Sequence, residues 1–246
     1  TIVACIERGF WSPHTFLVDA KPAGIHVAML RRAAETTGFE VEIKAAPWQR
    51  CIAWAKNGTV DALLSAVYSS DRAKYLHFPE GAAKDAKSHW RLSQADEVIV
   101  VRANSDFKWS GDRLSLPQPV ASKQGYRITK RLRAQGIVVA ATADDEKLFD
   151  LLLLERVHSL VAPRGLADQY LSKFGNEARL KILPQPITTL SYYMPVSKKG
   201  TLTRADAATI WGAIAKMREN KKTMTKIRLD SEFALTYCAQ KPEKCR

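Results

Sequence analysis

The stretch of sequence that decides the fold runs from Gly24 to Val67 and reads GIHVAMLRRAAETTGFEVEIKAAPWQRCIAWAKNGTVDALLSAV. Its first part has helical spacing of apolar residues, and Gly38 predicts that the helix ends after Thr37. The apolar residues at this spacing are Ile25, Ala28, Met29 and Ala33. From residue 39 to 44 apolar and charged residues alternate, which is typical of a strand with one buried face.

The same order of elements continues on both sides of this strand. Pro47 predicts the start of a second helix that ends at 57–58, and the apolar residues 60–67 predict a further strand. Upstream, the apolar residues 2–6 predict the first strand, which is followed by an irregular loop. Strands that alternate with helices form a parallel sheet, and ligands bind at the carboxyl ends of its strands.

A second unit of the same kind is expected further along the chain. Predicted strands at 98–101, 120–121, 138–141 and 157–161 alternate with predicted helical segments at 126–135, 144–155 and 166–174. A strand at 190–196 then leads into a helical region from 203 to 238. The predicted fold class is therefore α/β, with two lobes that each contain a central, mostly parallel sheet flanked by helices.

Composition narrows the classes of protein that this chain can be. Its 246 residues are 46% hydrophobic, which excludes a disordered tail or a fibre. No apolar run approaches the roughly 20 residues needed to cross a bilayer. The chain begins with a strand-like run and without Met, from which we expect an export signal to have been removed. The formal charge of +13 favours anionic partners over cationic ones.

Cysteine usage also favours export. Cys238 and Cys245 lie in a short polar segment with Pro242 between them, and a turn there predicts a disulfide. Cys5 and Cys51 would then form the other pair, or would be ordinary buried thiols. No further Cys or His pair stands near them at zinc spacing, so we expect no metal site, and we also expect no cofactor.

Four short groups of residues carry a resemblance to a known family. They are Gly24-Ile25-His26-Val27, Pro47-Trp48, Gly58-Thr59-Val60-Asp61-Ala62 and Ser70-Asp71-Arg72-Ala73-Lys74-Tyr75-Leu76-His77-Phe78. In this order and at this spacing they resemble the amino-acid-binding family of bacterial periplasmic solute-binding proteins, the two-lobed receptors that feed ABC transporters. A looser similarity extends over nearly the whole chain.

The resemblance implies a clamshell that closes around a small ligand. The first lobe would contain residues 1–102 and 195–246, the second lobe residues 103–194, and two crossover strands would form the hinge. Ligand that contacts both lobes shifts the population toward the closed state. The resemblance also implies a periplasmic monomer that is not an enzyme and whose partner is the membrane permease of an ABC transporter.

The family also implies ligand-binding positions in the first lobe. Arg72 stands where the family holds the ligand carboxylate, a task that suits the planar guanidinium. Trp48 and Trp11 stand where the family places aromatic walls around the ligand. The loop before Arg72 is one residue shorter than in the best-known members, and the residues that can assist Arg72 are Ser65, Tyr68 and Ser69.

The second lobe is expected to contribute backbone amides. Gly125 and Tyr126 stand where a predicted strand turns into a helix, and the first amides of a helix can receive a carboxylate. Arg127 can reinforce this positive end of the helix. These three residues complete the predicted binding site.

Two departures from the family pattern bear on the ligand. Residues 157–164 lack the Asp that usually takes the ligand ammonium, and Arg8 stands near a position where receptors for cationic amino acids keep an acidic group. Together with Arg72 and Arg164 they predict a small carboxylate that is neutral or acidic rather than cationic. Glu7 is the alternative partner for an ammonium, or pairs with an arginine at the surface.

Two other functions stay open. An enzyme on the same fold, of the cyclohexadienyl dehydratase type, would need an acid or base such as Glu7, His14 or His158 facing the ligand. An orphan receptor would instead serve a signalling or protein partner. The basic C-terminal region 196–246 carries no nucleic-acid-binding motif, so no nucleic acid is expected as a partner.

Overall fold

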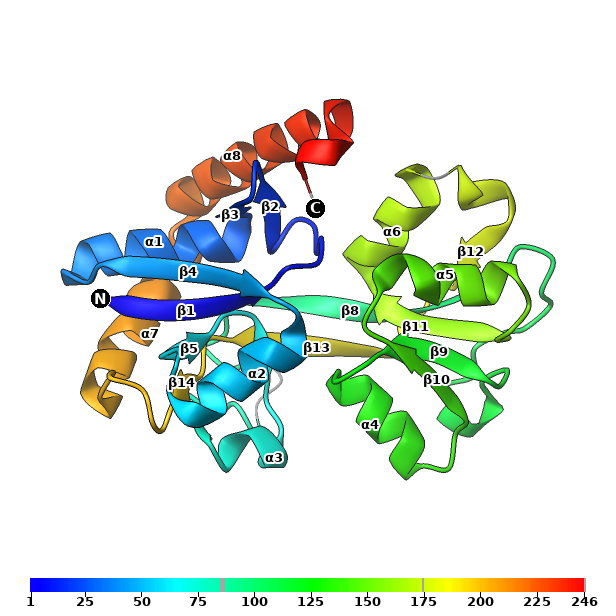
Figure 1. Cartoon of the computed structure of the whole chain (residues 1–246), viewed down its shortest axis with the longest axis horizontal. Helices are drawn as coiled ribbons and strands as arrows, with labels where there is room; N and C mark the ends of the chain where they lie inside the picture. The colour runs from blue at the N-terminus through cyan, green and yellow to red at the C-terminus, as the bar shows by residue number, and fades with distance from the viewer. Residues whose placement is uncertain (85–86, 174, 246) are drawn as a thin grey trace. The chain divides into compact units, whose positions relative to one another are not determined.

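A computed structural model describes residues 1–84, 87–173 and 175–245. Contacts divide it into unit 1, Thr1–Gln94 with Ser191–Arg246, and unit 2, Ala95–Leu190 (Figure 1). The chain enters unit 2 along β8 (Ser93–Arg102) and leaves it along β13 (Thr188–Tyr193). Unit 1 thus combines two separate stretches of sequence. The chain changes unit after residues 94 and 190, whereas the sequence predicted changes of lobe after residues 102 and 194.

Unit 1 is built around a sheet of five strands. Its elements are β1 (Ile2–Glu7), β2 (Phe16–Val18), β3 (Lys21–Ala23), α1 (Ile25–Thr37), β4 (Val41–Ala46), α2 (Trp48–Asn57), β5 (Ala62–Leu63), β6 (Ala66–Val67), α3 (Ser70–Ala73), β7 (Leu76–His77), β14 (Val196–Ser197), α7 (Arg204–Glu219) and α8 (Lys221–Gln240). The strand order is β4-β1-β5-β14-β7. The strands β4, β1 and β5 are parallel as predicted, whereas β14 pairs antiparallel with β5 and β7.

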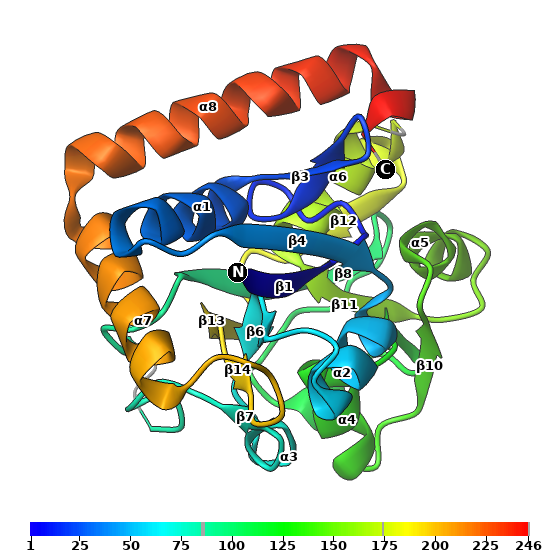
Figure 2. The same cartoon turned by 60° about the vertical axis from the view of Figure 1, so that its left-hand side comes forward.

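Helices α1 and α2 begin and end at the residues that the sequence indicates. Helix α1 ends at Gly38 and α2 ends at Gly58, both in the left-handed conformation that glycine adopts readily. Pro47 precedes α2 as its N-terminal cap residue. Helix α1 lies beside β4 and β1, and α8 runs over α1 (Figure 2). The core between them is apolar and contains Met29, Leu30 and Ile210.

Two local features differ from the prediction. The run 60–67 was expected to be one strand, but the structure has β5 and β6 with a break between them. Ser65 causes the break because its φ of 75° is incompatible with a regular strand. The second feature is the hairpin of β2 and β3, which was not predicted. Its turn residues Asp19 and Ala20 adopt positive φ without a glycine to signal the turn.

The predicted helical region from 203 to 238 contains two helices. Thr203 and Asp206 form a capping box at the start of α7. Asn220 ends α7, and its side chain accepts a hydrogen bond from the backbone of Thr223 at the start of α8. Trp211 of α7 donates a hydrogen bond to the carbonyl oxygen of Met194 at 2.7 Å, which fastens the helix beside β14.

Unit 2 repeats the α/β arrangement. Besides most of β8 and the start of β13, its elements are β9 (Val120–Lys123), α4 (Arg127–Ala134), β10 (Val139–Thr142), α5 (Asp145–Leu153), β11 (Ser159–Pro163), α6 (Arg164–Lys173), β12 (Leu180–Ile182) and short 3-10 turns at Arg113–Ser115 and Asn176–Ala178. The strands lie in the order β10-β9-β11-β8, of which the first three are parallel and β8 is antiparallel. Phe174, the end of the predicted segment 166–174, lies outside the described residues.

The sheet of unit 2 is covered on both faces. Helix α4 lies on one side and α5 with α6 on the other (Figure 1). Val98 and Val100 of β8 pack toward α5 and α6, whereas Ile99 and Val101 pack toward α4. This alternation along one strand follows from the pleat of a β-strand, and it buries both faces in apolar contacts.

The structure contains two disulfides. Cys238 and Cys245 pair as predicted, with their Cα atoms 5.5 Å apart, and join the end of α8 to the turn that follows it. Cys5 of β1 pairs with Cys51 of α2, with their Cα atoms 5.6 Å apart. The alternative of two buried free thiols is therefore excluded. The second bond fastens the first turn of α2 to β1, which lies between β4 and β5 in the sheet of unit 1.

Candidate functional site

Hydrogen bonds hold both the backbone and the side chain of Arg72 in unit 1. The Oγ of Ser69 accepts a hydrogen bond from the backbone N–H of Arg72 at 3.3 Å, which caps α3. The Arg72 Nη1 donates to the carbonyl oxygen of Val67 at 2.7 Å. The guanidinium carbon lies 5.3 Å from the ring centroid of Trp48, within the range of a cation–π contact. We call Arg72, Trp48, Ser69 and Val67 the arginine cluster.

Trp48 owes its place to the start of α2. It is the first residue of the helix after Pro47, and it is only 7% exposed. Cys51 follows one turn later and is bonded to β1, so this end of the helix is held by a covalent link. The structure therefore brings three of the predicted site residues together, namely Arg72, Trp48 and Ser69.

Ser65 and Tyr68 lie on the same connection between β5 and α3. The Oγ of Ser65 lies 2.7 Å from Nδ1 of His26, a residue that the sequence did not single out for the site. The ring of Tyr68 packs edge-on against Phe78, with centroids 5.1 Å apart. The connection thus directs its side chains to different neighbours. A role for Ser65 and Tyr68 in ligand binding stays a prediction.

Trp11 lies in a second group of residues in unit 1. Its ring centroid is 4.4 Å from that of His14, 5.6 Å from that of His26 and 4.5 Å from that of Tyr192. The rings of His14 and His26 are 4.6 Å apart. We call Trp11, His14, His26 and Ser65 the histidine cluster. The predicted aromatic walls Trp11 and Trp48 therefore belong to two separate clusters.

Both histidines of this cluster are held in the neutral form. Burial lowers the pKa of His14 to about 4. Burial also lowers the pKa of His26 well below its usual range, and the neighbouring His14 lowers it further. His14, a candidate acid or base of the enzyme hypothesis, is consequently uncharged at neutral pH. His158, another of these candidates, is exposed, and Glu7 is half-buried.

Arg8 is exposed beyond the end of β1. Its backbone N–H donates to the carbonyl oxygen of Ala46 at 2.9 Å, which continues the pairing of β1 with β4. Within the described residues the guanidinium of Arg8 forms no ion pair. Its position near a ligand therefore stays a prediction.

The predicted positions of unit 2 lie at the end of β9. Gly125 has a φ of 80°, which lets the chain turn from the strand into α4, and Tyr126 and Arg127 begin that helix. The sequence missed Lys123, which is buried beside them. Its Nζ lies 2.7 Å from both carboxylate oxygens of Asp145 and 5.8 Å from the ring centroid of Tyr126. The amide end of α4 is thus flanked by a partly buried ion pair.

Two carboxylates lie beside the segment 157–164, although the segment itself lacks the Asp that the family has there. Glu97 of β8 is buried and is opposite Pro163, the last residue of β11. Asp96 lies 4.0 Å from Arg164 and accepts a hydrogen bond from Thr189. The search along one strand missed these groups because they belong to the neighbouring antiparallel strand. Arg164 is therefore compensated by an acid, and it contributes less to the case for an acidic ligand than the sequence indicated.

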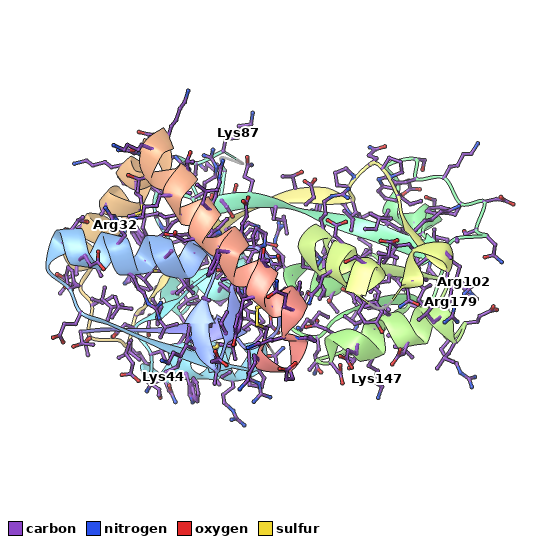
Figure 3. The ribbon with its side chains drawn as sticks, turned by 90° about the horizontal axis from the view of Figure 1, so that it is seen from above. Arg32, Lys44, Lys87, Arg102, Lys147 and Arg179 are labelled. Carbon is purple, nitrogen blue, oxygen red and sulfur yellow. A yellow bond between two sulfur atoms is a disulfide. The ribbon has the colours of Figure 1, made fainter. Side chains whose placement is uncertain are left out.

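The positive charge of the chain is spread over many elements. The basic residues labelled in Figure 3 are Arg32, Lys44, Lys87, Arg102, Lys147 and Arg179, and they come from separate segments of the chain.

In the described ranges no three His, Cys, Asp or Glu residues are grouped to hold a metal ion. None of the helices described has the length and hydropathy of a membrane span.

Solved structures with the same fold are numerous. A histidine kinase sensor domain with similarity to periplasmic binding proteins has a TM-score of 0.76 and 22% identity, over 94% of this chain and 95% of that one. The glutamate-bound GluR0 ligand-binding core from Nostoc punctiforme has a TM-score of 0.70 and 17% identity, over 92% and 97%. The arginine-, lysine-, histidine-binding protein ArtJ from Geobacillus stearothermophilus has a TM-score of 0.72 and 18% identity, over 93% and 94%.

These likenesses establish the two-lobed periplasmic-binding-protein fold. Curated protein sequences give no significant match to the chain. A family model, that of the bacterial extracellular solute-binding proteins, family 3, matches residues 2–228 and so covers nearly all of the chain. The resemblance found in the sequence is thereby confirmed, and the chain belongs to family 3 of the bacterial extracellular solute-binding proteins.

Proposed function

We propose that this protein is a receptor for a small carboxylate-bearing solute, an amino acid or related organic acid that is neutral or acidic, and that Arg72 receives the carboxylate. The observation that carries the proposal is the geometry of the arginine cluster. A planar cation is held against the ring of Trp48 and fixed by the carbonyl oxygen of Val67. A guanidinium held in one orientation matches the two oxygens of a carboxylate.

The proposed ligand class also follows from the residues around the arginine cluster. Trp48 offers a flat apolar face on which an aliphatic stem can pack. Arg8 adds a positive charge after β1, where a cationic side chain of a ligand would be repelled. In unit 2 the first turn of α4, with Tyr126 and Arg127, is proposed as a separate contributor for a carboxylate group.

The proposed setting is the periplasm, where the protein acts as a monomer without catalysing a reaction and delivers its ligand to the permease of an ABC transporter. Membership in a family of extracellular solute-binding proteins supports this location and this kind of partner. The two disulfides also fit an oxidising compartment.

A sensor is the second candidate function. The likeness to a histidine kinase sensor domain, with a TM-score of 0.76, supports it. Both candidates need the same ligand-binding residues, so uptake separates them. Loss of the protein from its cell abolishes uptake of the labelled ligand if the protein serves a transporter. Uptake stays unchanged if it serves a sensor.

The binding proposal is tested by thermal unfolding with a panel of ligands. Protein that has been unfolded and refolded to remove bound ligand is mixed with neutral, acidic and cationic amino acids and with dicarboxylates. Ligand at one hundred times its dissociation constant adds about 2.7 kcal/mol of stability, which raises the melting temperature by several degrees. We expect this rise with one neutral or acidic class and its loss in Arg72→Ala.

The control for this experiment is Arg50→Ala, which removes an exposed arginine from the same helix as Trp48. It should keep the full response to ligand. Tight binding of lysine or arginine with no response to any acidic or neutral compound would refute the proposed ligand class. Turnover of prephenate or arogenate would instead establish the enzyme.

A further inference from the structure

His26 connects three segments of unit 1 through one side chain. It lies in the first turn of α1 and has no exposed surface. Its Nδ1 lies 2.7 Å from the Oγ of Ser65, and its Nε2 lies 2.8 Å from the Oγ of Ser93. Ser65 belongs to the break between β5 and β6, and Ser93 begins β8. Both ring nitrogens therefore have a hydroxyl partner, each from a different part of the unit.

The loop that carries Trp11 is fastened to the same end of α1. The backbone N–H groups of Ile25 and His26 donate to the carbonyl oxygens of Pro13 and His14 at 2.9 and 3.0 Å. Gly24 permits this contact because it has a φ of 106°, and a Cβ at this residue would collide with the carbonyl oxygen of His14. The ring of His26 thus has a fixed neighbour in His14, and Trp11 packs on both rings.

The two ring nitrogens of a neutral imidazole have different hydrogen-bonding roles, so one hydroxyl partner must accept and the other must donate. One ring nitrogen carries a proton and donates it, while the other can only accept. If Nδ1 carries the proton, Ser65 accepts from the ring and keeps its own hydroxyl proton for another acceptor. If Nε2 carries it, Ser65 must donate to the ring, and only its lone pairs remain for a ligand. The tautomer of His26 therefore decides which kind of ligand atom Ser65 can bind.

Resting on the proposed function, we propose that His26 is a positioning residue for the ligand site, a neutral imidazole that carries its proton on Nδ1 and directs the hydroxyl proton of Ser65 toward a ligand carboxylate. A carboxylate offers only acceptor atoms, so it can bind Ser65 only when the Ser65 proton is not used by the ring. In this tautomer Nε2 can only accept, so the hydroxyl of Ser93, 2.8 Å away, is its donor. The same ring supports Trp11 and so fixes two predicted site residues at once.

A histidine that serves the fold alone would behave differently. Its replacement would lower the stability of the protein, but a ligand would still bind with its original affinity to the fraction that remains folded. A positioning residue changes the affinity itself, and its tautomer matches the ligand. Both properties can be measured.

The tautomer is measured first, by nitrogen-15 NMR of the imidazole rings in protein freed of ligand at neutral pH. The resonances of His26 are identified by their loss in His26→Gln. We expect Nδ1 to show the shift of a protonated nitrogen and Nε2 that of an unprotonated one, and Ser65→Ala to move the Nδ1 resonance more than the Nε2 resonance. A proton on Nε2 alone, or on both nitrogens, overturns the proposal.

Affinity is measured next, by calorimetric titration with L-glutamate, L-glutamine and L-aspartate as probes. We expect His26→Gln and Ser65→Ala each to weaken the binding of the best probe at least tenfold. Met29→Ala removes a buried side chain from the same helix, so it controls for lost stability and should keep the affinity. Unchanged affinity in His26→Gln, or an equal loss in Met29→Ala, contradicts the proposal.

The two measurements keep the two proposals apart. If the unmutated protein binds none of the three probes and no neutral or acidic compound of the thermal-unfolding panel, the proposed function fails, while the NMR result still decides the tautomer of His26. If a probe binds and the tautomer is the expected one, the affinities of the variants decide whether His26 positions the site.

Discussion

The arginine cluster and the histidine cluster lie in the same unit, and they differ in charge. The first contains a cation, whereas the histidine rings of the second are neutral. Arg72 carries a guanidinium, which stays charged in proteins, and it is only 7% exposed, next to a carbonyl oxygen and an aromatic ring. His14 and His26 lose their charge, because burial lowers the pKa of both rings. A buried charge is costly unless polar groups or a ligand compensate it, whereas buried neutral rings stabilise the core around them.

From this difference we predict that the arginine cluster serves ligand binding and that the histidine cluster also stabilises the fold. Changes in the arginine cluster should alter ligand affinity more than stability. Changes in the histidine cluster should alter both, because Trp11, His14 and His26 pack on each other. Four measurements test this division.

The largest effect is expected from the disulfide behind the arginine cluster. The double variant Cys5→Ala with Cys51→Ala opens a link between residues 46 apart in the sequence, which costs roughly 4 kcal/mol of stability in the chain-entropy description. It also frees the first turn of α2 that carries Trp48, so ligand affinity should fall. Urea unfolding followed by circular dichroism measures the first effect, and calorimetric titration the second.

The other disulfide provides the matched control. Cys238→Ala with Cys245→Ala opens a link between residues only 7 apart, with an expected cost of roughly 2.5 kcal/mol. Ligand affinity should stay unchanged because this bond joins α8 to the turn after it. Equal losses of affinity in the two double variants would show that Trp48 does not depend on the Cys5 link.

The second effect is the pH dependence that the histidine cluster introduces. Above pH 6.5 His14 is neutral in the folded and the unfolded chain. As the pH falls from 6.5 to about 4, the unfolded chain takes up a proton before the folded one, so stability is lost by roughly 3 kcal/mol from His14. His26, the titratable group packed against it, adds to the loss in the same direction. Urea unfolding at several pH values measures the slope.

The variant His14→Gln separates this contribution from that of the carboxylates. It should reduce the slope of stability against pH between pH 6.5 and 4, whatever stability is lost at all pH values through the missing ring. His158→Gln is the control, because it makes the same substitution at an exposed histidine outside the cluster. Identical slopes for the unmutated protein and His14→Gln would contradict the assignment of a neutral, buried His14.

The third comparison concerns the two predicted aromatic walls. Trp48→Leu removes the ring beside Arg72 and should weaken ligand binding about tenfold, or about 1.4 kcal/mol. Its melting temperature should change less than that of Trp11→Leu. Trp11→Leu removes the ring that packs on His14 and His26 and should lower the melting temperature as well as the affinity. The reverse pattern would show that the clusters have been assigned to the wrong roles.

The smallest effect is expected at the cap of α3. Ser69→Ala removes the hydroxyl that accepts the Arg72 backbone N–H and should cost about 1 kcal/mol of stability. Because Arg72 belongs to the capped turn, affinity should fall severalfold as well. Ser70→Ala, an exposed change at the next residue, is the control and should alter neither quantity. Full affinity in Ser69→Ala would show that the cap does not position Arg72.

The parts of the fold that were predicted are those with a local signal. Gly38 and Gly58 ended their helices because the left-handed conformation there favours glycine. Pro47 placed Trp48, one of the four residues of the arginine cluster, at the start of α2. The hairpin of β2 and β3 had no such signal, since Asp19 and Ala20 make its turn.

The parts of the site that were missed depend on contacts between distant residues. The helical spacing correctly predicted that Met29 and Ala33 are buried, but the structure buries His26 more fully than Ile25 or Ala28, which pack only partly buried on the core. His26 is recognisable only through Ser65 and Ser93, which are distant in the sequence. Lys123 is buried because Asp145, at the start of another helix, neutralises it. Local periodicity cannot reveal partners of this kind.

The spread of basic residues over many segments bears on the speed of binding. A field that extends around the protein accelerates the approach of an anion from any direction, and salt screens it beyond about 10 Å at 0.1 M. For an acidic ligand, the association rate constant should therefore fall as salt is added, while the dissociation rate constant changes little. A zwitterion with no net charge should show almost no such dependence. The net charge of +13 thus governs how soon an acidic ligand arrives, and the few buried residues govern how long it stays.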